Sequence, residues 1–192
     1  MSDYRRYFVP GGTYFFTLVA HQRRARFAEP EDLRRLRSAV AFVQREQPFR
    51  FVAAVVLPDH MHFIWTLPQE DSDYSRRIGR MKVHFTKSCQ TCTLAGEADL
   101  SSRHGRRENT VWQRRFWEHT IRDEAELHAL LDYIHYNPVK HGLARCPHEW
   151  PASSFWRWVA RGLHDCHWGC QCRNGAFAPP DFRALDRVVG DL

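Results

Sequence analysis

Four segments of the chain are rich in β-branched and aromatic residues and are bounded by Gly, Pro or polar residues, a pattern that predicts β-strands. They cover Thr13–Ala20, Phe49–Leu57, His60–Leu67 and Thr110–Ile121. Only Pro58 and Asp59 separate the second segment from the third. These two strands are therefore expected to form an antiparallel hairpin.

Apolar residues recur at helical spacing in other segments. The predicted helices are Glu31–Glu46, Tyr74–Gln90, a third from Asp123 to Asn137-Pro138, and a short one near Phe155–Arg161. Asp123 is the predicted N-cap of the third helix, and Glu126 stands three residues later, as in a capping box. Residues 91–110 are rich in Thr, Gly, Ser and charge and are interpreted as a loop.

The resulting order of elements, β-α-β-β-α-β-α, predicts an α+β fold with a ferredoxin-like split β-α-β plan. We expect an antiparallel sheet with the helices packed on one face, followed by an extra C-terminal helix and an irregular tail. The expected boundary separates a domain of residues 1–145 from a C-terminal extension of residues 146–192.

The third strand contains two histidines, His60 and His62. Side chains two apart in a strand share a face, so the imidazoles project together with their Cα atoms about 7 Å apart. The alternate residues of this strand point to the opposite face, which is expected to face the core: Met61, Phe63, Trp65 and Leu67. The spacing suits two ligands of one metal ion, but it also fits two unrelated histidines on a solvent-facing side.

The third helix places Tyr133 and Asn137 four residues apart, and therefore on one side. An amide oxygen at Asn137 is a candidate third ligand for a hard cation, and Tyr133 can keep its ring packed while its hydroxyl lies in a cleft. The alternative is that Tyr133 packs at the rim of the core and that Asn137 is an ordinary residue of a helix end. Tyr136 lies about 100° away from Asn137 around the helix and so does not share that side.

Basic residues outnumber acidic ones by 28 to 22, which gives a net charge of +6 and favours anionic partners, nucleic acid first. Candidate contacts to a DNA backbone stand in clusters on the second helix and on the fourth strand: Arg76, Arg77, Arg80, Lys82, Arg114 and Arg115. No apolar run is long enough for a membrane span, and no secretory signal or phosphate-binding G-x-x-x-x-G-K-[ST] run is found, so we expect a cytoplasmic protein without a nucleotide cofactor.

The six cysteines are expected to be thiols in such a compartment. They form a Cys89-x-x-Cys92 pair, a Cys166-x3-Cys170-x-Cys172 group and a single Cys146. A zinc site that draws on both clusters has unfavourable spacing for the common zinc patterns.

Three stretches of the chain together resemble REP-associated tyrosine transposases, which are single-tyrosine HUH endonucleases. They are "PDHMHFIW", "RRFWEHTIRDEAELHALLDYIHYNPVKHGL" and "WPASSF", and the resemblance runs from about Tyr14 to Phe155. His141 departs from the alanine usual after the lysine, and the tail beyond Arg161 lies outside the resemblance.

The resemblance implies an HUH endonuclease fold that cuts single-stranded DNA beside short hairpins. A tyrosine attacks the scissile phosphate and forms a 5′-phosphotyrosine and a free 3′-hydroxyl. Tyr133 matches the nucleophile, His60 and His62 match the metal ligands, and Asn137 matches the amide residue that completes the metal site. The expected metal is Mg²⁺, with Mn²⁺ as a substitute because Mn²⁺ accepts imidazole more readily.

Two other hypotheses remain open from the sequence. One is a non-cleaving module that binds structured nucleic acid on a ferredoxin-like sheet. The other is a structural zinc protein that uses Cys166, Cys170, Cys172 and their neighbours. The sequence leaves monomer and homodimer equally open, and it does not identify the group that activates Tyr133.

Overall fold

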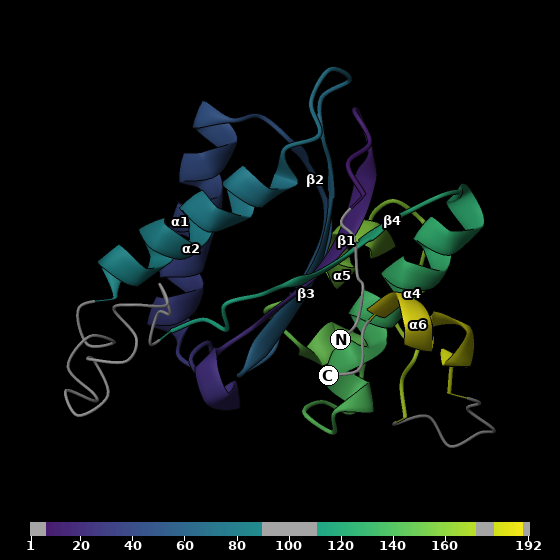
Figure 1. Cartoon of the computed structure of the whole chain (residues 1–192). Helices are drawn as coiled ribbons and strands as arrows, with labels where there is room; N and C mark the ends of the chain where they lie inside the picture. The colour runs from purple at the N-terminus through teal and green to yellow at the C-terminus, as the bar shows by residue number, and fades with distance from the viewer. Residues whose placement is uncertain (1–6, 90–110, 172–178, 190–192) are drawn as a thin grey trace.

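The computed structural model describes residues 7–89, 111–171 and 179–189 (Figure 1). The expected loop 91–110, with its Arg103–Arg107 cluster, lies outside the described residues, as do Cys92 and Cys172. The strands are β1 (Thr13–Val19), β2 (Arg50–Val56), β3 (His60–Thr66) and β4 (Trp117–Thr120). The α-helices are α1 (Pro30–Glu46), α2 (Tyr74–Ser88), α4 (Glu124–Lys140), α5 (Phe155–Val159) and α6 (Asp186–Val189). Short 3₁₀ turns are η1 (His21–Arg23), η4 (Pro147–Glu149) and η5 (Arg183–Leu185).

The four strands form one antiparallel sheet in the order β2-β3-β1-β4. This is the strand order of a ferredoxin-like split β-α-β plan, so the predicted α+β class is confirmed. The β2–β3 hairpin is also confirmed. The fourth strand is shorter than predicted, because the segment before it meets β1 only through an isolated bridge between Ala20 and Trp112.

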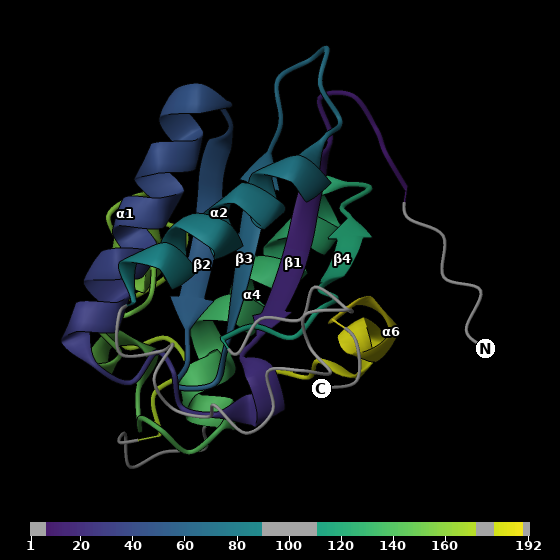
Figure 2. The same ribbon diagram turned by 60° about the vertical axis from the view of Figure 1, so that its left-hand side comes forward.

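The helices α1 and α2 cover one face of the sheet (Figures 1 and 2). The core-facing residues of β3 pack there, as the alternation in the sequence predicted: Met61, Phe63, Trp65 and Leu67. The ring of Trp65 stacks on Phe49 with centroids 4.1 Å apart. Burial of such rings removes 150–250 Å² of mostly apolar surface each and is a main source of stability for this layer.

The helix α4 packs on the opposite face of the sheet, so the expectation that the helices share one face is wrong (Figure 2). The second face of the sheet is apolar as well: Phe15, Val55 and Ile64 lie on it and are fully buried. An apolar sheet face must be covered, and α4 covers it with residues such as Leu130, Leu131 and Ile134. The histidine face of β3 is therefore a second core and not a solvent-facing surface.

Asp123 caps α4 as predicted, with its carboxylate accepting the Glu126 N–H at 2.8 Å. The predicted end of this helix at Asn137-Pro138 is wrong, because the helix continues through Pro138 to Lys140. Amides that follow the helix satisfy the carbonyls of its last turn. His141 N–H donates to the Asn137 carbonyl at 3.0 Å, and Leu143 N–H donates to the Pro138 carbonyl at 2.8 Å. Asn137 is therefore held inside the helix and does not stand at a frayed end.

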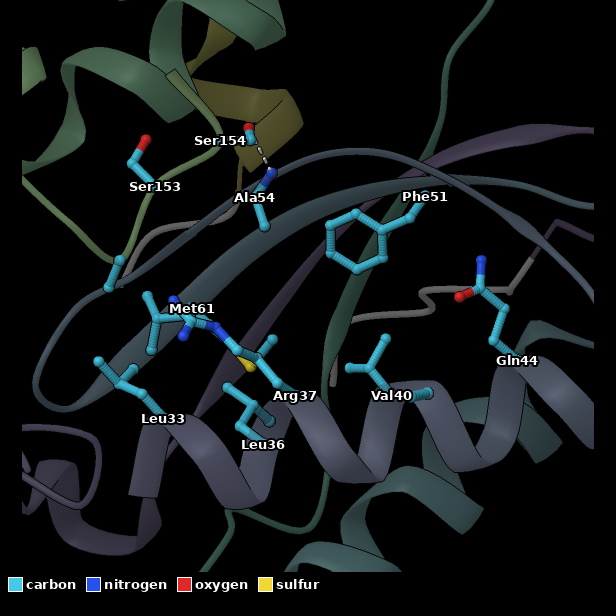
Figure 3. A pocket seen from close by; sticks show the side chains of 13 residues that line it. Leu33, Leu36, Arg37, Val40, Gln44, Phe51, Ala54, Met61, Ser153 and Ser154 are labelled. Atoms are coloured by element: carbon cyan, nitrogen blue, oxygen red, sulfur yellow. Dashed lines mark hydrogen bonds between the residues drawn. The ribbon is translucent and has the colours of Figure 1, made fainter. Parts of the chain in front are cut away.

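The start of the C-terminal extension covers the edge of β2. Val56 N–H donates to the Ala152 carbonyl and Ser154 N–H donates to the Ala54 carbonyl, each at 2.8 Å. A pocket of about 350 Å³ lies between this segment, β2 and α1, and is lined mainly by apolar side chains (Figure 3). None of the candidate site residues lines this pocket.

A buried histidine pair attaches the extension to α4. His135 Nδ1 lies 3.0 Å from His164 Nε2, and His135 Nε2 lies 3.0 Å from the Ser154 hydroxyl. Burial, reinforced by the neighbouring charges, lowers the pKa of His135 to about 3 and that of His164 to about 4. Both imidazoles are therefore neutral in the folded protein at neutral and mildly acidic pH.

The histidine pair makes folding stability depend on pH. In the unfolded chain both residues titrate near pH 6.5, so below that pH the unfolded state binds protons that the folded state excludes. Stability is therefore expected to be complete above about pH 6.5 and to fall as the pH drops towards about 4. The urea midpoint of His164→Gln should fall less between pH 7 and pH 5 than that of the wild type. Equal slopes for the two proteins would contradict the assignment.

Candidate functional site

The strand β3 places His60 and His62 side by side under α4. Their rings have centroids 5.0 Å apart, and their residues are only 2% and 0% exposed. Burial is the main cause that holds the pKa of His62 well below its usual value, and the neighbouring His60 adds to it. Both imidazoles are therefore neutral, which is the form that binds metal ions.

The hydrogen bonds of His62 fix which ring nitrogen carries its proton. Its Nδ1 lies 2.9 Å from the Thr17 hydroxyl, and that hydroxyl lies 3.4 Å from the Val189 carbonyl oxygen. A carbonyl only accepts, so Thr17 donates to Val189 and accepts from His62 Nδ1–H. His62 Nε2 is then left with a lone pair, and it is buried without a hydrogen-bond partner among the described residues.

An acidic neighbour orients His60. Its Nδ1 lies 2.6 Å from the Asp59 carboxylate, which also accepts from Arg23 at 3.0 Å. Burial raises the pKa of Asp59, but the bonds from His60 and Arg23 outweigh it, so this pKa lies below its usual value. Burial lowers the pKa of His60, and Asp59 and Asn137 oppose that effect only in part. A neutral His60 thus donates through Nδ1 and presents Nε2, the arrangement common in carboxylate–histidine–metal sites.

The helix α4 brings Asn137 and Tyr133 to the same place. Asn137 is 0% exposed, and its side-chain amide makes no hydrogen bond of normal length and angle among the described residues, although it lies close enough to His60 to affect the pKa of that imidazole. The Tyr133 ring lies 5.3 Å from the His62 ring and 6.1 Å from that of Phe15. The structure therefore brings together all four residues that the sequence singled out, from two elements about seventy positions apart.

The donors in this cluster fit a divalent metal ion. A buried amide and an imidazole nitrogen without partners are costly unless something binds them. Two imidazoles and one amide oxygen form a mixed nitrogen and oxygen set, which suits Mn²⁺ well and Mg²⁺ less strongly. His60, His62 and Asn137 are the residues that would hold the ion.

Several residues beside this cluster had not been singled out as site residues. Asp59 and Thr17 orient the two histidines, and Lys140 Nζ lies 4.9 Å from the centre of the Tyr133 ring. The His141 ring lies 5.1 Å from that of His60. From the C-terminal segment, Phe182 packs its ring 5.4 Å from that of Tyr133. The sequence held two signals for these contacts: Asp59 directly precedes His60, and Lys140 stands seven residues after Tyr133 on one helix.

Tyr136 and His135 face away from the histidines of β3. Tyr136 packs against Trp168 and Phe182, with ring centroids 6.2 and 5.8 Å apart. His135 belongs to the pair with His164. The geometry therefore places Tyr133, and not Tyr136, beside the candidate metal ligands.

Arg77 is not available to DNA, so the prediction of a DNA contact there is wrong. It is 2% exposed, and its guanidinium donates to the Asp71 carboxylate at 2.6 Å. It also donates to the backbone carbonyls of Gln47, Pro48 and Asp73 at 3.3, 3.1 and 2.9 Å. A guanidinium with its donors used in this way ties the start of α2 to the loop after α1.

Replacing Arg77 should therefore destabilise the fold. We expect Arg77→Met to lower the free energy of unfolding by about 2–4 kcal/mol, because three carbonyls and a carboxylate lose their donor. Arg76→Met is the matched control, one residue away at an exposed position. It should change the free energy of unfolding by less than about 0.5 kcal/mol. Urea unfolding of the three proteins measures both. A stable Arg77→Met protein with weakened DNA binding would restore Arg77 as a DNA contact.

The other predicted DNA contacts lie in two places. Arg76, Arg80 and Lys82 stand on α2, across the sheet from His60; Arg80 pairs with Glu46, and Lys82 donates to the Gln113 carbonyl at 2.9 Å. Arg114 and Arg115 are exposed in the segment just before β4. This segment runs beside the end of β1, because Trp112 bridges to Ala20 and Trp117 pairs with Thr17. That end of β1 also pairs with His60 and His62.

Among the described residues no helix is long and apolar enough to cross a membrane.

Comparisons with known proteins identify the family of this chain. A family model described as "Transposase IS200 like" matches residues 9–137. The chain is 40% identical over 189 residues to a REP-associated tyrosine transposase of Escherichia coli (strain K12), an alignment that covers 98% of this chain and 99% of that protein. It is 42% identical over 170 residues to a protein of the same group from Haemophilus influenzae, covering 88% of this chain and 94% of that one.

A solved structure, described as a REP-associated tyrosine transposase bound to a REP hairpin, has the same fold. It is 40% identical to this chain and superposes with a TM-score of 0.76, over 99% of this chain and all of the other. On this likeness in sequence and structure, the chain belongs to the REP-associated tyrosine transposases of the IS200-like transposase family.

Proposed function

We propose that this protein is a single-stranded DNA endonuclease and strand transferase that cuts beside hairpins of the REP type through a 5′-phosphotyrosine. The observation that carries the proposal is the packing of Tyr133 against His62, 5.3 Å between ring centroids, in a cluster with His60 and the buried amide of Asn137. Its family membership and the hairpin-bound relative support the same activity.

The reaction assigns one step to Tyr133. Its hydroxyl oxygen attacks the scissile phosphorus, a new O–P bond forms, and the bond to the 3′ oxygen breaks. The phenol proton leaves, the departing 3′ oxygen takes up a proton, and the DNA keeps a free 3′-hydroxyl. A 3′-hydroxyl of another strand can reverse this step, because the phosphotyrosine keeps the energy of the phosphodiester bond.

The residues around Tyr133 bind and orient the reacting groups. Thr17 and Asp59 keep Nε2 of both histidines pointed at the cluster, and Asn137 supplies an amide oxygen from one turn after Tyr133. Lys140 places a positive charge beside the phenol ring, which favours a developing phenolate. A divalent ion held by His60, His62 and Asn137, Mg²⁺ in the cell with Mn²⁺ as substitute, would supply positive charge to the oxygens of the scissile phosphate.

Backbone contacts to the DNA are proposed for Arg114 and Arg115, which are exposed at the histidine end of the sheet. Arg76, Arg80 and Lys82 would serve a part of the DNA that reaches the α2 face. Each phosphate contact that is removed should reduce the slope of log affinity against log salt by roughly one unit.

The test is a cleavage assay of the full chain on single-stranded DNA with hairpins from the flanks of its own gene. With Mg²⁺ or Mn²⁺, a covalent protein–DNA adduct and a fragment that ends in a 3′-hydroxyl are expected on a denaturing gel. A chelator added before the DNA should prevent the formation of both products. Hairpin binding without any adduct, across both metals and all flanking sequences, would instead establish a non-cleaving nucleic-acid module.

A further inference from the structure

A second cluster of metal-binding side chains lies in the C-terminal extension, away from the histidines of β3. It consists of Cys146, His148 and Cys170, whose ligand atoms all lie within 4.8 Å of one another. Cys170 Sγ is 3.4 Å from His148 Nδ1. In a tetrahedral zinc site the sulfur and nitrogen ligands lie roughly 3.5–3.8 Å apart, given Zn–S and Zn–N bonds of about 2.3 and 2.0–2.1 Å. The distance from Cys170 to His148 is close to this range, and with all ligand atoms within 4.8 Å of one another, small side-chain movements would complete the geometry.

The fold holds the two halves of this cluster together. Gln171 N–H donates to the Arg145 carbonyl at 3.0 Å, which joins the chain beside Cys170 to the chain beside Cys146. Gly169 has φ +70°, and a Cβ there would meet Pro147 at 3.0 Å and the Tyr136 ring at 3.1 Å. Glycine suits both the close approach and the left-handed backbone conformation, and a larger residue there would be strained. The cluster is therefore preorganised, and not a chance meeting of mobile surface residues.

The chemistry of the three ligands selects the metal. Thiolate and imidazole ligands favour zinc, whereas Mg²⁺ prefers oxygen. Cys146 is fully buried and Cys170 is 2% exposed, so the sulfur atoms are shielded from solvent. His148 Nδ1 also lies 3.0 Å from the Cys166 carbonyl oxygen. The same nitrogen cannot donate to a carbonyl and bind a metal, so binding through Nδ1 would replace that hydrogen bond.

We propose that Cys146, His148 and Cys170 bind a zinc ion that joins two parts of the C-terminal extension to each other beside α4. Gly169 and Trp168, next to Cys170, pack on Tyr136, which stands three residues after Tyr133 on α4. The site shares no residue with the cluster around His62 and has a structural role. It is independent of the proposed cleavage activity.

The test measures metal content of the full chain, carried on a tag without histidines and purified without chelator. Mass spectrometry of the metals should find about one zinc per chain in the wild type and in His60→Ala/His62→Ala, which removes the other candidate site. Cys146→Ser/Cys170→Ser should hold less zinc by on the order of tenfold or more. Cys166→Ser, the matched control, should retain the metal.

Three results would overturn the proposal: a wild-type protein without zinc, zinc that disappears with His60 and His62, or equal loss in Cys166→Ser. Should the double serine variant fail to fold, cobalt(II) loaded into the wild-type protein decides the matter. A thiolate-to-cobalt charge-transfer band with the visible bands of tetrahedral cobalt would support the site, and a spectrum without the thiolate band would refute it.

Discussion

Tyr133→Phe is expected to abolish the covalent adduct with hairpin DNA and to slow cleavage by on the order of 10⁴-fold or more. The change removes one oxygen, the proposed nucleophile, and leaves the ring to pack against Phe15, His62 and Phe182. Folding and hairpin binding should therefore remain close to wild type. Adduct yield on a denaturing gel, with DNA affinity measured in parallel, separates loss of chemistry from loss of binding.

Tyr136→Phe is the matched control for this experiment. Tyr136 is on the same helix and is nearly as buried as Tyr133, 5% exposed against 4%, but it faces Trp168 and the extension. Its variant should form the adduct at a rate within a few-fold of the wild type. An adduct that survives in Tyr133→Phe and is lost in Tyr136→Phe would transfer the nucleophile to Tyr136.

His62→Ala is expected to weaken Mn²⁺ binding by on the order of 100-fold or more, and to remove the adduct at ordinary metal concentrations. The physical reason is that His62 Nε2 is buried with no partner among the described residues and is held in position through Thr17. Titration of Mn²⁺ into the protein without DNA, followed by electron paramagnetic resonance, measures the affinity directly. Near-ultraviolet circular dichroism checks that the variant keeps its packed core.

Two further variants test whether the loss of Mn²⁺ affinity is specific to His62. Thr17→Val removes the hydrogen-bond partner of His62 Nδ1 and should weaken Mn²⁺ binding by about 10–100-fold. His84→Ala removes an imidazole on α2, across the sheet, and should leave the affinity unchanged. Unaltered Mn²⁺ binding in a folded His62→Ala protein would remove His62 from the metal site.

Much of the fold was predictable because local patterns determine it. The period-two alternation from Met61 to Leu67 gave the core face of β3 correctly, and the capping residue Asp123 gave the start of α4. The i, i+4 spacing placed Tyr133 and Asn137 on one side of a helix. These predictions need only the geometry of a single element.

The remaining features depend on contacts between elements that sequence spacing does not encode. Thr17 meets His62 only because β1 pairs with β3 in one register. Arginine is usually a surface residue, so the sequence predicts that Arg77 is exposed. It is buried because Gln47, Pro48 and Asp71, which lie outside its helix, fold against it. The spacing of Cys146 and Cys170 in the chain is unlike common zinc patterns, and the fold of the extension closes the gap between them.

The division of the metal-site residues between a strand and a helix has a consequence for hydrogen exchange. β3 is paired on both edges, so its amides exchange only when the sheet itself opens. α4 rests on the sheet through side chains and can separate from it in a smaller opening. Binding an ion to His60, His62 and Asn137 together would add its binding free energy to the cost of that separation. Opening the sheet at β3 also releases the ion, so metal should slow amide exchange in α4 and in β3 by a similar factor, although α4 holds only one of the three ligands.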